Sequence, residues 1–342
     1  MSLRPSSYVR SMGTAHAPPP SGAGAYGARL LAWGDDLQRR HGLLGFPYAV
    51  IRKYGDDAGG RQAALITYYG FLSIFPLLLV AVSVLAKVLV DHAALRTDME
   101  KALVPLPLQE TVEAALTSMP SSGLPLALGV VGLLFAGTGV VFSAYETLNH
   151  VAGVPVRSRF GFVVRYARVL VMVVVVVAAG LVVAALTVAA AALPDVVVLQ
   201  RIAAAASTVV VVFFVLIGAA KALLARTVLL RDAWPAAAGG AVAVTVVLTA
   251  GAGLLTALIS RAGPVYGSFA TVAGIFALFY LVSQALVYSA ETAVVRHHRL
   301  WPRALDSARP TPADVRALGL LATEQERLAV ERIDVRFDRP GP

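Results

Sequence analysis

Six long stretches of the chain carry almost only apolar residues, and the polar residues gather between these stretches and at both ends. A helix of about 20 apolar residues crosses roughly 30 Å of hydrocarbon, and each stretch is long enough to do so. The apolar residues run on without the alternation of a β-barrel, and backbone amides cannot stay unpaired in lipid, so the stretches are predicted to be helices. The sequence therefore predicts an all-α membrane protein. Its membrane domain at 47–300 is a six-transmembrane helix bundle with spans at 64–90, 124–146, 169–193, 202–225, 234–259 and 268–295.

Two segments outside the spans have patterns of their own. Residues 1–46 are rich in Pro, Gly, Ser and Ala and show no apolar period, which is typical of a disordered tail. Residues 91–123 form the long loop between the first two spans. Apolar residues at helical spacing in this loop predict an external amphipathic helix on the membrane surface: Leu108, Val112, Ala115 and Met119.

The C-terminal tail at 301–342 also contains a helix signal. Thr311 followed by Pro312 is a favourable helix start, because a threonine side chain caps free backbone amides and proline fits the first helical position. Apolar residues at helical spacing follow, so an amphipathic helix is predicted at about 312–333.

Positive charge is divided unequally between the two faces of the predicted bundle. One face carries 24 Lys and Arg residues in the tails and two loops, and the other carries four, with Lys87 inside the first span. Since cytoplasmic loops hold the excess of positive charge, both termini are expected in the cytoplasm and the protein in the bacterial cytoplasmic (inner) membrane. The net charge of +9 then reflects topology and contact of the Arg clusters with anionic lipid headgroups, and no nucleic-acid binding is expected.

Composition excludes several other classes of protein. With 14% charged residues, the chain has too few to cover a soluble protein of 342 residues. It has no cysteine, its six histidines lack metal-ligand spacing, and it has no phosphate-binding loop or nucleophile elbow. The sequence therefore predicts no catalytic residues, metal, cofactor or enzymatic activity.

Polar groups are costly in hydrocarbon, so their positions within the spans carry functional information. The first and last spans each have a polar stripe on one face, which either packs helices together or lines a hydrated, substrate-facing path. Pro76 is also expected to kink the first span. The candidate substrate or ion pathway consists of Gln62, Tyr69, Ser73, Pro76, Tyr280, Gln284 and Glu291.

Glu291 lies about one turn from the cytoplasmic end of the last span. One interpretation is a structural ion pair with an arginine of that face, and the other is a site for a proton or a lipid headgroup. The sequence leaves both interpretations open. The arginines expected at that face are Arg165, Arg168, Arg226 and Arg231.

Two further groups of residues are predicted to gather at the membrane faces. A polar cluster is expected at the cytoplasmic face, either as an ion-pair network or as a binding site: Glu146, Asn149, Arg231, Asp232 and Trp234. A tight external turn is expected between the last two spans: Gly263, Pro264, Tyr266 and Gly267.

These motifs together resemble the YihY/BrkB family of bacterial inner-membrane proteins, in order and over residues 45–300. The family usually has Gly-Ala-Glu where this chain has Ser-Ala-Glu at 289–291. The resemblance implies six spans with cytoplasmic termini. The stretches that carry it are 62–76 (QAALITYYGFLSIFP), 146–154 (ETLNHVAGV), 231–234 (RDAW), 263–269 (GPVYGSF) and 289–291 (SAE).

The resemblance leaves the biochemical role open. Members of the family have been labelled ribonuclease BN or a serum-resistance virulence factor, and relatives are linked to movement of envelope lipids. The first hypothesis is a transporter that moves or flips a lipid or lipid-linked molecule, and the second is a non-transporting membrane scaffold or assembly factor. A ribonuclease is the least favoured, because neither tail offers metal ligands or an acid–base pair. A homo-oligomer or a partner in an envelope complex stays open.

Overall fold

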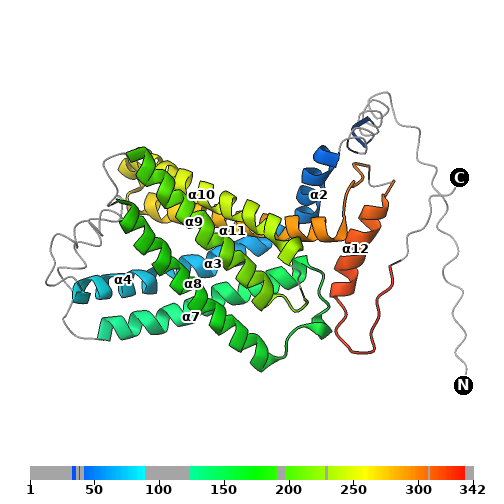
Figure 1. Cartoon of the computed structure of the whole chain (residues 1–342), viewed down its shortest axis with the longest axis horizontal. Coiled ribbons are helices and arrows are strands. Elements are labelled where there is room, and N and C mark those ends of the chain that lie inside the picture. Colours follow the sequence, from blue (N-terminus) through cyan, green and yellow to red (C-terminus); the bar gives the residue numbers. More distant parts are fainter. Residues whose placement is uncertain are drawn as a thin grey trace, which may run out of the picture.

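The structure is a computed structural model that describes residues 33–35, 38, 42–88, 124–191, 197–227, 230–306 and 309–335. The regular elements of this part of the chain are helices (Figure 1). The predicted external segment at 91–123 lies outside the described residues.

Within the described residues, six helical segments are long and apolar enough to cross a membrane, as the hydropathy pattern predicts. The first candidate span, Gly59–Val80, consists of two consecutive helices, and each of the others is one helix. The helices are α3 (Gly59–Leu72), α4 (Ile74–Val88), α7 (Leu124–Val151), α8 (Phe162–Ala191), α9 (Val197–Leu223), α10 (Leu230–Tyr266) and α11 (Ser268–His298).

The first span is interrupted at Ser73, between α3 and α4. The interruption lies three residues before Pro76, which has no backbone N–H and whose ring crowds the carbonyl of the preceding turn. Helical hydrogen bonding continues across the break, because the Ser73 amide still bonds the Tyr69 carbonyl at 3.0 Å. At the place where the sequence predicts a kink, the structure thus has a one-residue break between two helices.

The predicted external turn is shorter in the structure than the sequence indicates. Gly263, Pro264 and Tyr266 belong to the last turn of α10, which ends at Tyr266. Gly267 alone separates α10 from α11, and its φ of 55° is in the region that favours glycine. A single residue can reverse the chain here because it needs no side chain.

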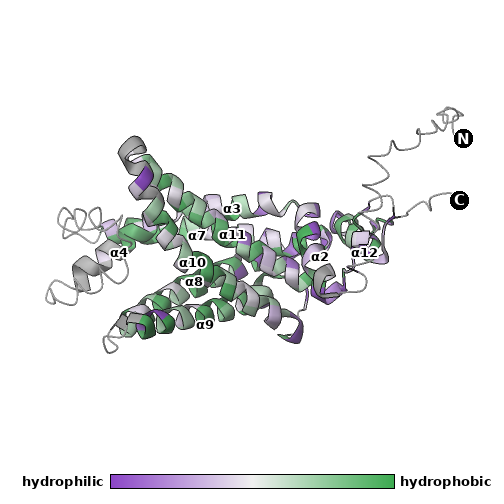
Figure 2. Cartoon of the chain, turned by 90° about the horizontal axis from the view of Figure 1, so that it is seen from above, coloured by the Kyte–Doolittle hydropathy of each residue, from purple (hydrophilic) through white to green (hydrophobic). Residues whose placement is uncertain are grey.

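Two further helices lie at one end of the bundle, α2 (Gly42–Asp56) and α12 (Pro312–Glu324) (Figure 1). We call this end, where Asp57, Val151, Leu223, Leu230 and His298 lie, the polar end. α12 begins where the sequence predicts but ends at Glu324, so the helix predicted to about residue 333 is too long. The span helices lie close together near the polar end and diverge toward the opposite end (Figure 2). Buried apolar clusters join the helices near the polar end: α7 with α8 and α9 (Tyr145, Val169, Leu223), α2 with α11 and α12 (Ala49, Val295, Ala317), and α3 with α11 (Ala63, Val287).

Part of the N-terminal segment expected to be a disordered tail packs against the C-terminal segment. Asp35 and Gln38 are buried, and the Leu305 amide donates to Asp35 Oδ1 at 2.8 Å. The segment expected as tail therefore includes a docked part, and α2 begins at Gly42 inside it. The pattern of 1–46 gave no sign of this contact, because it depends on polar hydrogen bonds and not on an apolar period.

We expect Gly139→Ala to destabilise the bundle, because a Cβ at Gly139 would lie 2.3 Å from the Tyr69 ring. Overpacking of this kind lowers the free energy of unfolding by about 1–3 kcal/mol. Gly180→Ala is the matched control, since nothing lies within 4 Å of a Cβ there, and it should change stability by less than about 0.5 kcal/mol. Thermal unfolding in detergent measures both variants, and equal stability would contradict close packing of α3 on α7.

Candidate functional site

Three charged side chains meet in the interior of the polar end. Lys53 comes from α2, Asp57 from the turn after α2, and Glu291 from α11. Lys53 Nζ donates to the Asp57 carboxylate and to the Val151 carbonyl at 2.8 Å, and it lies 3.1 Å from Glu291 Oε2. The exposed fractions of these side chains are 3%, 1% and 0% for Lys53, Asp57 and Glu291. We call these residues the charge triad.

Local backbone geometry explains how Lys53 and Asp57 come together. They are four residues apart, and the Asp57 amide bonds the Lys53 carbonyl at 2.9 Å, so both side chains lie on one face of the last helical turn. Ala58 then takes a left-handed conformation with φ of 50°, which turns the chain into α3. Val151 ends α7, where carbonyl groups lack helical partners and the helix dipole is negative, so it is a favourable acceptor for an ammonium group.

The charge triad holds two carboxylates for one ammonium group. Asp57 Oδ1 and both Glu291 oxygens are buried and accept no hydrogen bond from the described residues. Glu291 Oε2 is near Lys53 Nζ, but the contact lacks hydrogen-bond alignment. Burial raises the pKa of Asp57, although the charge of Lys53 opposes the rise. The site therefore carries an excess of negative charge with few donors.

Tyrosine side chains pack near the triad. The ring of Tyr54 stacks on that of Tyr288, with centroids 4.1 Å apart and planes 8° from parallel. Tyr280, one of the predicted pathway residues, packs with Tyr54 against Ala63 and Val287. Burial raises the pKa of Tyr54 to about 12, so its hydroxyl stays neutral.

One of the two interpretations of Glu291 requires an arginine partner, whereas the structure places Lys53 beside it. Lys53 and Asp57 were not among the predicted site residues. The available signal was weak: Lys53 is one of only four lysines, and it is followed four residues later by Asp57 just before the first span. Nothing in that spacing indicates contact with a residue 238 positions away.

A second network connects the triad to the C-terminal segment. The ring nitrogens of His150 lie 2.8 Å from Glu324 Oε2 and 3.0 Å from the Asp57 carbonyl oxygen. Arg159 donates to Glu324 Oε1 and to Glu146 Oε2, both at 2.6 Å. Burial alone would raise the pKa of Glu324, but His150 and Arg159 outweigh burial and hold it below the ordinary value. The end of α12 is thus tied to the end of α7.

The start of α12 is fixed by another buried charge. Thr311 is the N-cap, and it forms a capping box with Asp314. Arg303 bonds the carboxylates of both Asp314 and Asp56, the latter at 2.7 Å, and its side chain is 2% exposed. Through Arg303, α12 is tied to α2, so both ends of α12 are held by ion pairs.

Three of the four predicted residues of the first span contact α7, and Ser73 bonds within its own helix. Gln62 Oε1 accepts from Thr147 Oγ1 at 3.3 Å, and the ring of Tyr69 lies against Gly139. Pro76 packs on Gly132, where a Cβ would lie 3.0 Å from its ring. The Ser73 hydroxyl bonds the Gly70 carbonyl of its own helix at 2.6 Å. This stripe is used for helix packing.

In the last span the structure brings together only part of the predicted stripe. Gln284 is half-buried on α11, two turns before Glu291. A buried polar contact that the sequence did not indicate lies beside it, where Thr67 Oγ1 of α3 is 3.0 Å from Ser283 Oγ. Of the other predicted residues of this span, Glu291 belongs to the triad and Tyr280 packs with Tyr54.

The polar cluster expected at the cytoplasmic face separates into distinct contacts. Glu146 pairs with Arg159. The fully buried Asn149 donates to the Leu223 carbonyl at 3.0 Å and accepts from the Ala225 amide at 2.9 Å, so it caps the end of α9. Arg231 and Trp234 are exposed, whereas Asp232 lies 3.3 Å from His297 Nδ1.

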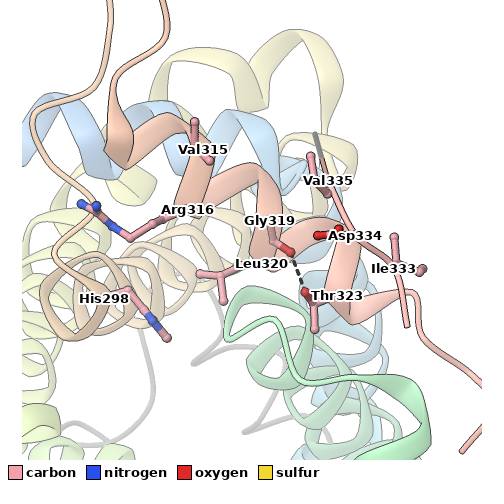
Figure 3. Close-up of a pocket in the computed structure, with 9 residues that line it drawn as sticks. All are labelled: His298, Val315, Arg316, Gly319, Leu320, Thr323, Ile333, Asp334 and Val335. Atoms are coloured by element: carbon pink, nitrogen blue, oxygen red, sulfur yellow. Dashed lines mark hydrogen bonds between the residues drawn. The ribbon is translucent and has the colours of Figure 1, made fainter. Parts of the chain in front are cut away.

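A surface pocket of about 320 Å³ lies beside α12, apart from the charge triad (Figure 3). His298 and Arg316 line one side, and Ile333, Asp334 and Val335 line the other. None of these residues belongs to the predicted site. Within the described ranges, no group of His, Asp and Glu is arranged to hold a metal ion.

We expect Asn149→Ala to lower the free energy of unfolding by about 2–4 kcal/mol, because it leaves a buried carbonyl and a half-buried amide without partners. Arg231→Ala is the control, since its side chain is 80% exposed and its loss should cost less than about 0.5 kcal/mol. Thermal unfolding in detergent compares them. A small loss in Asn149→Ala would mean that α9 is capped by another group.

Docking of α12 should weaken in acid. The pKa of Glu324 is lowered in the folded protein, so its stabilising contribution is complete above its ordinary value of 4.5 and is lost as pH falls further. Glu324→Gln should reproduce this loss at neutral pH, at about 2 kcal/mol. Hydrogen exchange of the α12 amides measures both effects, and Glu331→Gln, at a half-exposed loop position beyond the end of α12, is the control. Exchange that does not change with pH or with Glu324→Gln would show that other contacts dominate docking.

A family model described as "Virulence factor BrkB" matches residues 50–314 of the chain. No curated protein and no solved structure matches it. The matched residues include the charge triad and the six candidate spans, and they end in the first turn of α12. The chain is therefore a multi-pass membrane protein that belongs to the BrkB family.

Proposed function

We propose that the protein transports or flips a lipid or lipid-linked envelope molecule across the bacterial inner membrane. The observation that carries this proposal is the charge triad, whose Glu291 lies fully buried in the last span. Ionisable groups in spans are expensive, and they are usually retained where a substrate or ion is bound or moved. A second carboxylate is not expected from a need for stability alone, because burying one carboxylate with one cation would cost less free energy.

The shape of the bundle supports a lipid-sized substrate. The span helices diverge away from the polar end (Figure 2), and many large apolar side chains along them are exposed, including Phe135, Phe214 and Phe269. Such faces suit acyl chains, whereas the polar end offers exposed or half-exposed cationic groups such as Arg226 and Arg231 for anionic headgroups. In this proposal the polar end faces the cytoplasm, because the excess of Lys and Arg lies there.

A second candidate function is a non-transporting membrane scaffold. The observation that favours it is the use of the first-span stripe for packing, where Tyr69 and Pro76 lie against glycines of α7. Residues that close the contact between two helices cannot at the same time line an open path between them. If this reading holds, the polar groups fix the bundle and the activity belongs to a partner.

Lipid translocation in reconstituted liposomes separates the two functions. We expect the wild-type protein to move fluorescent phospholipids between leaflets faster than empty liposomes do, and to return them chemically unchanged. Glu291→Gln should reduce the rate to that of empty liposomes, because it removes the ionisable group from the span. Gly180→Ala, at a lipid-facing position with open space around it, should keep the wild-type rate. A wild-type rate equal to that of empty liposomes, over several lipid classes, would support the scaffold.

A further inference from the structure

We propose that Asp57 and Glu291 hold one exchangeable proton between them beside a charged Lys53, so that the charge triad is a proton-binding site. This inference rests on the proposed function only for its role, which is to couple transport to protons. The binding itself is a property of the three side chains: a proton from water joins a carboxylate oxygen and later leaves it, with no change in oxidation state.

The two carboxyl groups are close neighbours. Both contact the same Lys53 nitrogen, one by a hydrogen bond and one at 3.1 Å. They are therefore at most about two hydrogen-bond lengths apart. Two carboxylates at such a separation in a buried site resist joint ionisation, and one of them then takes up a proton.

Hydrogen bonding leads to the same assignment. Lys53 donates to the Asp57 carboxylate and to the Val151 carbonyl, and its nitrogen lies 3.1 Å from Glu291 Oε2 without hydrogen-bond alignment. The shortage is on the acid side, where three carboxylate oxygens lack a donor among the described residues. A proton on one carboxyl group supplies a donor to the other, and it removes the uncompensated charge.

The other ionisable groups around the triad do not cancel its excess charge. Tyr54 of α2 is a neutral phenol near Glu291, Tyr288 of α11 stacks on its ring, and Tyr280 of α11 packs against the same apolar cluster. His150 of α7 faces the Asp57 backbone carbonyl, and its other ring nitrogen contacts the Glu324 carboxylate of the C-terminal segment, which balances any charge on the ring. The described surroundings thus leave the pair of carboxyl groups with a single cation, Lys53.

Infrared spectroscopy of the full-length protein in lipid nanodiscs tests the proposal, because a protonated carboxyl group absorbs apart from a carboxylate. We expect one buried protonated carboxyl group at neutral pH that disappears as pH is raised. Glu291→Gln and Asp57→Asn should each abolish this band, because each leaves one carboxylate paired with Lys53. Lys53→Met should instead increase the band toward two protonated groups. Glu146→Gln, which alters a half-exposed carboxylate paired with Arg159, should leave the band unchanged.

Several outcomes would overturn the proposal. One is the absence of the band in the wild-type protein at every pH. Another is its persistence in both Glu291→Gln and Asp57→Asn, and a third is loss of the band when sodium is added at constant pH. The two neutralising variants should also keep or raise the melting temperature, whereas a structural ion pair predicts a fall. The band is measured without transport, so failure of lipid translocation would not contradict the proton site. A protein that translocates lipid but lacks the band would refute only the proton site.

Discussion

Burial of the Lys53 ammonium group among acceptors from three parts of the chain sets the geometry of the polar end. Its nitrogen bonds the carboxylate after α2 and the last carbonyl of α7, and it contacts Glu291 of α11. A buried cation must be surrounded by acceptors, and a buried carboxylate by donors or a counter-charge. Once Lys53 is in place, the ends of three helices are fixed relative to one another. Removing Lys53 would leave two buried carboxylates without a counter-charge, so the arrangement depends on its ammonium group.

The C-terminal segment extends this arrangement outward from the membrane domain. Glu324 joins His150 and Arg159 at one end of α12, and Arg303 joins Asp314 to Asp56 at the other. His150 also contacts the Asp57 carbonyl, so the triad and α12 share a neighbour. A change in the position of α12 would therefore be felt next to the triad. This connection gives the segment a physical means to influence a site that it does not itself form.

The polar residues of the spans divide into two kinds by what surrounds them. Those of the first span have found partners: Gln62 bonds Thr147, and the ring of Tyr69 fills the space over a glycine. These contacts account for the position of both side chains by packing between α3 and α7. Glu291 differs because its oxygens remain buried without aligned donors. Function is best sought where the polar group remains unsatisfied, since that cost is not recovered by the fold.

Some features could be predicted because they depend on residues that are neighbours in sequence. Apolar runs indicate the six spans, the missing amide of Pro76 indicates the helix break near it, and a threonine before a proline indicates the start of α12. The partners of the polar groups could not. Lys53 meets Glu291, Asn149 caps α9 at Ala225, and Asp35 meets Leu305 across many intervening residues. Helical periodicity tells which residues share a face but not which helix that face meets, so the first-span stripe could equally have lined a path. Hydropathy and local geometry determined the elements, whereas only the tertiary structure decided which charges compensate one another, because that depends on how the helices pack.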